Sequence, residues 1–323
     1  MTAEWFDRAG HIFITGGAGF IASHLLERLL EKHRITIYDN LHRNAFRFTR
    51  LDGHPNLRFI QGDVLEAEKL CAAMAGADVC VHAAAIAGIY TVSKRATLTM
   101  KVNFLGTYHA LEAAVRNGVK RFIDFSTSEV YGPFVYRGKE TDGTTLGQVG
   151  EKRWVYAVSK LASEHFAHSY QEEYGLAVTS VRPFNVYGPR QIGEGAVQQM
   201  VRRALGHEDI TVFNDGTQIR SWCYVTDFCD GLERALFRED LASEVFNLGN
   251  PQATITVLGL AQTIIRMAGS HSRIVFEPHP GPEVEMRVPD ISKARKLLGY
   301  DPKVGLEEGL ARCIEWYREH PDA

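Results

Sequence analysis

The sequence has no excess of charge of either sign. Its 36 lysines and arginines face 39 aspartates and glutamates, for a formal net charge of −3. A nearly neutral chain offers no general attraction to nucleic acid or to an anionic membrane surface. Neither is therefore expected as a partner, and an anionic ligand must be met by arginines placed locally.

Cysteines and long apolar runs are also scarce. The five cysteines, at positions 71, 80, 223, 229 and 313, show no spacing such as C-x-x-C, so no metal site is expected. They lie in core-like segments, which fits reduced thiols in a cytoplasmic protein. Residues 1–10 have acidic residues and no apolar core, and no later apolar run is long enough to span a bilayer. The sequence therefore argues against secretion and membrane insertion.

A glycine-rich turn near the beginning of the chain is the first positive signal. The apolar run 11–15 ends in Gly16-Gly17-Ala18-Gly19-Phe20-Ile21-Ala22, and leucines at 25, 26, 29 and 30 follow at helical spacing. A strand, a glycine turn and a helix in this order can bind a pyrophosphate on free backbone N–H groups. Alone the pattern is weak, because Ala22 stands where a third glycine is common.

An acidic residue ends the next apolar run, 35–39. Asp39 comes 20 residues after Gly19, where a carboxylate can bind an adenosine ribose and repel a 2′-phosphate. This position favours NAD over NADP. Arg43 complicates the prediction, since an arginine there can accommodate the phosphate.

Strands and helices then alternate along the chain. Strands are expected at 57–60, 78–82, 121–126 and 176–181, with helices at 66–75, 94–117 and 154–174 between them. This alternation predicts an α/β fold with a Rossmann-like, doubly wound parallel sheet, whose ligands lie at the carboxyl ends of the strands.

The regular alternation loosens after residue 181. Helices are expected near 195–205, 226–238, 256–268 and 306–318, and short strands near 210–213, 222–225, 245–248 and 273–276. We predict a cofactor domain, 1–181, and a smaller, interleaved α/β substrate lobe, 182–323, with segments near 215–250 returning to the first domain. No repeat or linker separates them, so the site is expected in the cleft between the two.

A tyrosine and a lysine stand four residues apart in the apolar, helix-compatible run 154–160. On a helix, Tyr156 and Lys160 share one face, so an ammonium can lie beside a phenol whose ordinary pKa is about 10. Such a tyrosine can act as a base near neutral pH. The pair alone fits an ordinary amphipathic helix equally well. Its catalytic interpretation is favoured by the glycine turn and by Thr127, Ser128 and Glu129 at a strand end.

These residues resemble the extended short-chain dehydrogenase/reductase family, the NAD-dependent epimerases and dehydratases that modify nucleotide sugars. The resemblance covers nearly the whole chain, through Thr15-Gly16-Gly17-Ala18-Gly19-Phe20-Ile21, Ser126-Thr127-Ser128-Glu129-Val130-Tyr131-Gly132, Tyr156-x-x-x-Lys160 and Asp290-Ile291-Ser292-Lys293-Ala294. Within the family, Arg153-Trp154-Val155-Tyr156 and Arg287-Val288-Pro289 look most like UDP-glucuronate decarboxylases.

The resemblance implies a role for each matching residue. Tyr156 would take the proton from the sugar 4-hydroxyl, Thr127 would bind that hydroxyl, and Lys160 would lower the pKa of Tyr156 and hold the nicotinamide ribose. Ser128, Glu129 and Arg287 complete the expected catalytic set. The NAD-binding set is the Tyr156 and Lys160 pair together with Gly16, Gly19, Phe20, Ile21, Asp39, Asn40, Arg43, Asp63, Val64, Ala83, Ala84 and Ala85. The expected contacts with the nucleotide sugar are Ala87, Tyr90, Asn185, Arg190, Val212, Arg220 and Arg287.

Two residues bear on the choice of reaction. Dehydratases of the family carry an aspartate where Ser128 stands, and 4-epimerases usually carry a small residue where Glu129 stands. We therefore expect decarboxylation of UDP-glucuronate through a 4-keto intermediate, to UDP-4-keto-pentose or UDP-xylose. A UDP-sugar 4-epimerase is the alternative, and a non-catalytic dinucleotide-binding regulator a minor one. Segments 85–91 and 41–50 depart from the common decarboxylase pattern and leave the sugar open.

The family resemblance also implies a homodimer. The helices expected at 94–117 and 154–174 would form its interface.

Overall fold

The computed structural model describes residues 10–279 and 281–323, and a parallel sheet of seven strands lies at its centre. The strand order is β12-β7-β5-β4-β1-β2-β3, and every neighbouring pair is parallel. The strands are β1 (His11–Thr15), β2 (Arg34–Asp39), β3 (Leu57–Gln61), β4 (Val79–His82), β5 (Arg121–Phe125), β7 (Ala177–Pro183) and β12 (Glu244–Leu248). The predicted Rossmann-like sheet is confirmed.

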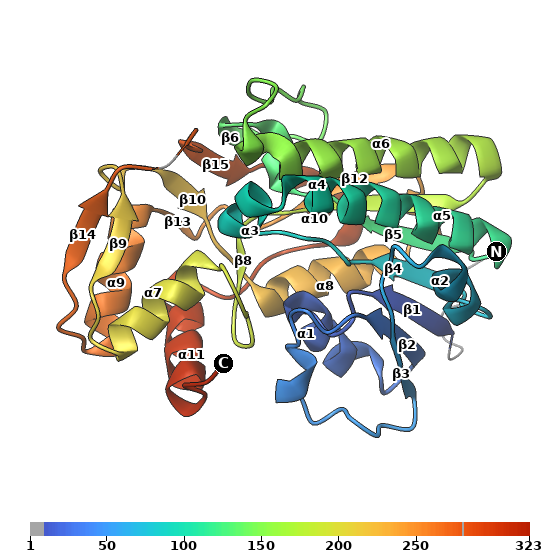
Figure 1. Ribbon diagram of the computed structural model, residues 1–323, viewed down its shortest axis with the longest axis horizontal. Helices are drawn as coiled ribbons and strands as arrows, with labels where there is room; N and C mark the ends of the chain where they lie inside the picture. Colours follow the sequence, from blue (N-terminus) through green and yellow to red (C-terminus); the bar gives the residue numbers. More distant parts are fainter. Residues whose placement is uncertain (1–9, 280) are drawn as a thin grey trace.

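Helices cover both faces of this sheet (Figure 1). One face carries α2 (Ala67–Ala73), α5 (Gly106–Arg116) and α6 (Val155–Tyr174), which pack against one another. The other carries α1 (Phe20–Leu29) and α8 (Val225–Leu236). Each face buries its own cluster of apolar side chains.

The helix expected at 94–117 is interrupted. It comprises α4 (Ala96–Met100), a π-helical turn (Lys101–Leu105) and α5, and a short helix, α3 (Ile89–Lys94), precedes it. Arg95 separates α3 from α4 because its backbone, at φ −131° and ψ 44°, leaves the helical conformation. The π turn places Asn103 so that its side chain bonds both Ile86 backbone groups and Ser159 of α6.

The smaller lobe has a four-stranded sheet of order β13-β10-β15-β6. Its strands are β6 (Phe134–Gly138), β10 (Ile219–Ser221), β13 (Thr254–Thr256) and β15 (Met286–Pro289). Two parallel pairs, β8 (Val186–Tyr187) with β11 (Cys223–Tyr224) and β9 (Ile210–Phe213) with β14 (Ile274–Glu277), accompany it. The remaining helices are α7 (Ala196–Leu205), α9 (Val257–Ala268), α10 (Ser292–Leu298) and α11 (Leu306–Glu319). Sequence patterns did not predict β6, β15 or α10, which are only four to seven residues long.

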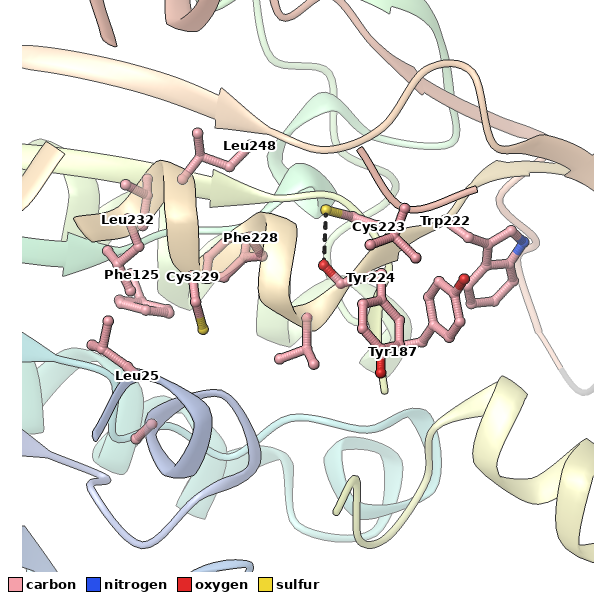
Figure 2. Close-up of a cluster of buried hydrophobic side chains, with 14 of the residues drawn as sticks. Leu25, Phe125, Tyr187, Trp222, Cys223, Tyr224, Phe228, Cys229, Leu232 and Leu248 are labelled. Atoms are coloured by element: carbon pink, nitrogen blue, oxygen red, sulfur yellow. Dashed lines mark hydrogen bonds between the residues drawn. The ribbon is translucent and has the colours of Figure 1, made fainter. Parts of the chain in front are cut away.

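The chain crosses between the two sheets. Strand β6 precedes β7 in sequence but pairs with β15, whereas β12 follows the smaller lobe's β10 but pairs with β7. Figure 2 shows the resulting shared core, in which Phe228 and Leu232 of α8 lie near Phe125 of β5 and Leu248 of β12. Each of the two sheets therefore contains strands from both the first and the second half of the sequence.

One buried amide joins the two sheets. The Asn247 side chain, on β12, donates to the carbonyl oxygens of Gly138 (2.9 Å) and Asp290 (3.2 Å) and accepts from the Tyr131 hydroxyl (2.9 Å). Its backbone N–H donates to Glu140. These contacts fix the end of β6 against the seven-stranded sheet.

Among the described residues, no helix is long and apolar enough to cross a membrane.

Candidate active site

A cavity of about 450 Å³ lies at the carboxyl ends of β1, β2, β4 and β5. Its lining includes all twelve residues predicted from the resemblance to bind the dinucleotide outside the Tyr-Lys pair. These are Gly16, Gly19, Phe20, Ile21, Asp39, Asn40, Arg43, Asp63, Val64, Ala83, Ala84 and Ala85. Open α/β sheets bind ligands at this edge, so the cavity has the position of a cofactor site.

The glycine turn forms one wall of the cavity. Gly16 has φ +68°, and a Cβ added there would lie 2.7 Å from the backbone nitrogen of Ala84, so both conformation and space require glycine. Gly19 is the N-cap residue of α1 and provides no side-chain cap. The first N–H groups of this ten-residue helix therefore remain available to an anion, as a dinucleotide pyrophosphate requires.

Asp39 is fixed at the end of β2. Its carboxylate accepts backbone hydrogen bonds from Ala18 (3.1 Å) and Leu41 (2.6 Å). Burial raises its pKa, and these two hydrogen bonds oppose the rise. The carboxylate is thus held in one orientation at the cavity wall, where it can accept from a ribose hydroxyl.

Tyr156 lies near the start of α6, and its hydroxyl shares a side-chain hydrogen bond with Thr127. Desolvation raises the pKa of Tyr156 to about 12, with Glu129 and Asp124 acting in the same direction and the Thr127 hydrogen bond opposing. The lowering of this pKa by Lys160 stays a prediction for the protein with its cofactor bound. The phenol is protonated at neutral pH in this structure because burial outweighs every stabilising contact.

Lys160 is 1% exposed, and its ammonium is one of the few buried polar groups in the described chain without a hydrogen-bond partner. Burial lowers its pKa, while Asp124 and Glu164 oppose this. An unpaired buried ammonium is costly, so this position calls for an acceptor from a bound molecule. Together with the glycine turn and Asp39, it fits a dinucleotide whose ribose hydroxyls accept from Lys160.

Glu129 is held between two arginines. It lies in the 3₁₀ turn Ser128–Tyr131 (η4) after β5, and its carboxylate forms ion pairs with Arg287 of β15 and with Arg153 (2.6 Å). Arg287 is 2% exposed and also donates to the carbonyl oxygen of Gly132 at 2.7 Å. Burial alone would raise the pKa of Glu129, but Arg287 and Arg153 hold it at about 2. The carboxylate is therefore ionised at every physiological pH.

Arg153 is the site residue that sequence reasoning assigned no role. It stands three residues before Tyr156, its guanidinium lies 5.3 Å from the Trp154 ring, and its position beside Glu129 could not be inferred from spacing. The only signal was its place in the Arg-Trp-Val-Tyr sequence.

The ion pairs of Glu129 predict acid sensitivity. A carboxylate with a folded-state pKa near 2 and an ordinary value of 4.5 contributes stability that is complete above pH 4.5 and is lost as the pH falls toward 2. Chemical denaturation between these pH values should therefore show a smaller loss of unfolding free energy for Glu129→Gln than for the wild type. Equal losses would contradict the depressed pKa.

The residues predicted to meet the nucleotide sugar do not form one group. Ala87 lines the cavity, but the Tyr90 ring is exposed. The Asn185 amide donates to the carbonyl oxygen of Ser221 at 2.9 Å. Arg220 donates to that of Val284 at 2.5 Å, and burial with neighbouring Arg287 lowers its pKa to about 10. Arg220 and Arg287 are partners on neighbouring strands, and Arg287 reaches Glu129 of η4.

Two predicted substrate-side residues have partners within the protein. Arg190 makes a two-pronged ion pair with Glu27 of α1, at 2.7 Å for each contact, and also contacts His24, so its contact with a diphosphate stays a prediction. The Val212 side chain is 0% exposed within the core, so it cannot contact a substrate. Val212 is instead part of the apolar core.

Comparison with known proteins agrees with this geometry. The sequence profile of the NAD dependent epimerase/dehydratase family matches residues 12–249, which is most of the chain. The chain belongs to this family. The predicted family and its cofactor, NAD, are thereby confirmed.

Relatives with assigned activities cover almost the whole chain. A UDP-N-acetyl-alpha-D-glucosaminuronate decarboxylase of Bacillus cytotoxicus is 36% identical over 95% of this chain and 97% of its own length. UDP-glucuronic acid decarboxylase 5 of Arabidopsis thaliana is 34% identical, over 95% and 89%. The solved UDP-glucuronic acid 4-epimerase of Bacillus cereus, in complex with UDP-glucuronic acid and NAD, has a TM-score of 0.89 at 29% identity, covering 96% and 99%.

Proposed function

We propose that this protein is an NAD-dependent decarboxylase of a UDP-uronate, with UDP-glucuronate as substrate and UDP-4-keto-pentose or UDP-xylose as product. The observation that carries the proposal is the ionised Glu129 between Arg287 and Arg153, beside Thr127 and Tyr156. Thr127 and Tyr156 serve the oxidation step that the whole family shares, whereas the Glu129 cluster is not needed for that step. The names of two relatives that cover almost the whole chain support decarboxylation of a UDP-uronate.

Oxidation at carbon 4 of the sugar would depend on Tyr156 and Thr127. NAD, when bound, supplies the acceptor for the hydride. Tyr156 takes the proton of the 4-hydroxyl, and Thr127 orients that hydroxyl through the hydrogen bond that it already shares with Tyr156. The high pKa of Tyr156 in the chain alone means that this base requires the positive charges of Lys160 and of the bound cofactor nearby.

Loss of carbon dioxide follows from the chemistry of the oxidised sugar. A ketone at carbon 4 lies β to the carboxylate on carbon 5. The bond to the carboxylate carbon therefore breaks with its electrons moving into the enolate at oxygen 4. The proton that Tyr156 took from the hydroxyl is then beside this oxygen and stabilises its charge.

The arginines of the Glu129 cluster suit an anionic sugar. Arg287 and Arg153 provide two fixed guanidinium groups, and Arg220 stands next to Arg287 on the neighbouring strand β10. Guanidinium groups bind carboxylates and phosphates through paired, charge-assisted hydrogen bonds. We propose that Arg287 and Arg220 bind the anionic part of the substrate. Glu129 would lie against the carboxylate that leaves as carbon dioxide. It would also help to place the proton that carbon 5 then takes up.

A second reaction and a second substrate each have an observation in their favour. The Bacillus cereus structure shares the fold and is named for 4-epimerisation of UDP-glucuronic acid. The Bacillus cytotoxicus relative is named for an N-acetylated uronate. Against epimerisation stands Glu129, a large ionised residue pinned by two arginines where the keto-sugar would need to turn. A regulator without turnover does not explain why Tyr156, Lys160 and Thr127 are all retained.

Product analysis tests the proposal directly. The protein is incubated with NAD and, in separate reactions, UDP-glucuronate, UDP-N-acetylglucosaminuronate and UDP-glucose, and the products are weighed by mass spectrometry. We expect loss of one carbon dioxide from UDP-glucuronate. An unchanged mass with inverted stereochemistry would replace decarboxylation by epimerisation, loss from the N-acetylated uronate alone would change the substrate, and no reaction would favour the regulator.

We further propose that the protein is a cytoplasmic homodimer. Leu105, Tyr108 and Val158, on neighbouring parts of α5 and α6 and the turn before them, expose apolar side chains. Contiguous exposed apolar surface of this kind is typical of a subunit interface. All five cysteines are free thiols, which fits a reducing compartment.

The dimer gives a simple expectation. Light scattering at assay concentration should give twice the chain mass, and Val158→Glu should halve it because the charge would be buried at the interface. Phe276→Glu, at an exposed apolar position on β14 of the smaller lobe, serves as a comparison for general effects of a new charge. A monomeric wild type would contradict this proposal.

A further inference from the structure

Three loops meet at the rim of the cofactor cavity, and Glu194 holds them together. This residue lies between β8 and α7, and its carboxylate accepts from the backbone N–H groups of Tyr90 (2.7 Å) and Thr91 (3.0 Å) at the start of α3. The Thr91 hydroxyl donates to the same carboxylate. The Arg43 guanidinium, from the loop after β2, lies 3.8 Å away from it.

Arg43 is the first arginine after Asp39 in the sequence, and it lines the cavity wall. Its Nη2 donates to the carbonyl oxygen of Ala87 at 2.9 Å and faces Glu194. An arginine in this segment is the usual means by which related folds accept an adenosine 2′-phosphate. Here the guanidinium is turned instead toward the loops that cover the cavity.

The backbone around this contact leaves little room for another arrangement. Gly193 has φ +104°, and a Cβ there would lie 3.0 Å from the Cζ atom of Arg43. Gly88 has φ +108°, and a Cβ there would lie 2.6 Å from a Glu194 carboxylate oxygen. Glycines on both sides thus allow Arg43 and Glu194 to approach each other closely.

We propose that Glu194 determines the cofactor preference of this enzyme by holding Arg43 away from the adenosine ribose. Asp39 repels a 2′-phosphate directly, and Glu194 withdraws Arg43, a cation that would compensate for that repulsion. The preference for NAD over NADP then has two separate sources in the chain. The inference concerns cofactor binding only and is independent of which sugar reaction the protein performs.

Removal of the Glu194 charge should release Arg43. Glutamine at this position keeps a carbonyl oxygen for the N–H groups of Tyr90 and Thr91, but it no longer attracts a guanidinium. Arg43 is 34% exposed at its side chain, so it has room to turn toward the ribose once that attraction is lost, and its hydrogen bond to the Ala87 carbonyl oxygen is then the contact it must give up. One charge-assisted contact with phosphate then improves binding of a 2′-phosphorylated ligand by roughly tenfold or more.

The experiment compares two pairs of ligands by isothermal titration calorimetry, without substrate and without turnover. The pairs are NAD⁺ with NADP⁺, and ADP with 2′,5′-ADP, which isolates the phosphate from the nicotinamide half. The variants are Glu194→Gln, Arg43→Met and the double variant. Glu68→Gln is the matched control, because Glu68 also pairs with an arginine, Arg116, but on the surface away from the cavity.

The ratio of affinities within each pair decides the outcome. We expect Glu194→Gln to shift both ratios about tenfold toward the 2′-phosphorylated ligand, and the double variant to lose that gain. Glu68→Gln should leave the ratios unchanged. If Glu194→Gln weakens both ligands of a pair equally, Glu194 only shapes the loops and the proposal is wrong. It is also wrong if the gain survives in the double variant, because Arg43 would not be its source.

Discussion

Tyr156→Phe should reduce the rate of NAD reduction by UDP-glucuronate roughly a thousandfold or more, in the upper part of the range for one acid–base group. The substitution removes one oxygen atom. That oxygen shares a side-chain hydrogen bond with Thr127 at the proposed position of the 4-hydroxyl. Without it, the 4-hydroxyl has no base, so hydride cannot leave carbon 4. Decarboxylation fails as a consequence, because no ketone forms.

Single-turnover absorbance of NADH measures this step without dependence on later ones. Tyr174→Phe is the matched control, since Tyr174 ends the same helix and its exposed ring lies far from the cavity. Affinity for NAD should remain within a few fold in both variants, because the phenol is not part of the cavity lining. Reduction of NAD by Tyr156→Phe at the wild-type rate would remove Tyr156 from the mechanism.

Glu129→Gln should separate the two halves of the reaction. We expect NAD and UDP-glucuronate to bind and NADH to form, while release of carbon dioxide slows roughly a hundredfold or more, as for loss of one catalytic group. The reason is that Glu129 would act mainly in the step after oxidation, and such a residue affects that step more than ground-state binding. A keto-acid intermediate and NADH should therefore accumulate together.

Folding must be checked in this variant, because two buried arginines lose their shared partner. The thermal unfolding midpoint and NAD affinity serve that purpose. Glu307→Gln is a matched control, since Glu307 pairs with Arg266 on the surface of the smaller lobe. A folded Glu129→Gln that decarboxylates at nearly the wild-type rate would contradict the proposed role and favour epimerisation.

The sequence predicted the cofactor cavity well because its signals are local. A strand, its terminal turn and the next helix are contiguous, so Gly16, Asp39 and Asp63 each follow their own strand and meet where parallel strands end. The twelve residues needed no knowledge of how distant segments pack. Only the interruption of the helix at 94–117 escaped detection, because nothing in the polarity pattern marks Arg95 as a break.

The substrate side was predicted poorly because it depends on distant segments. Glu129 and Arg287 are 158 residues apart and meet only because β15 pairs with β6. Arg190 looked suited to a diphosphate, yet Glu27, 163 residues away, binds it. The pKa of Tyr156 likewise reflects burial that no spacing reveals. For these residues the sequence revealed the charge and the motif, but not the side chain that each one contacts in the fold.

β12 pairs with β7 but follows it far along the sequence, and this affects folding during synthesis of the chain. The edge of β7 is covered only when residues 244–248 pair with it, and Asn247 then fixes β6 through Gly138. During synthesis, the backbone hydrogen-bonding edge of β7 therefore stays unpaired until more than sixty further residues have been added. A fragment ending at residue 181 would keep that edge permanently, together with Phe125 uncovered by α8. Such a fragment should aggregate rather than serve as a free-standing dinucleotide-binding module.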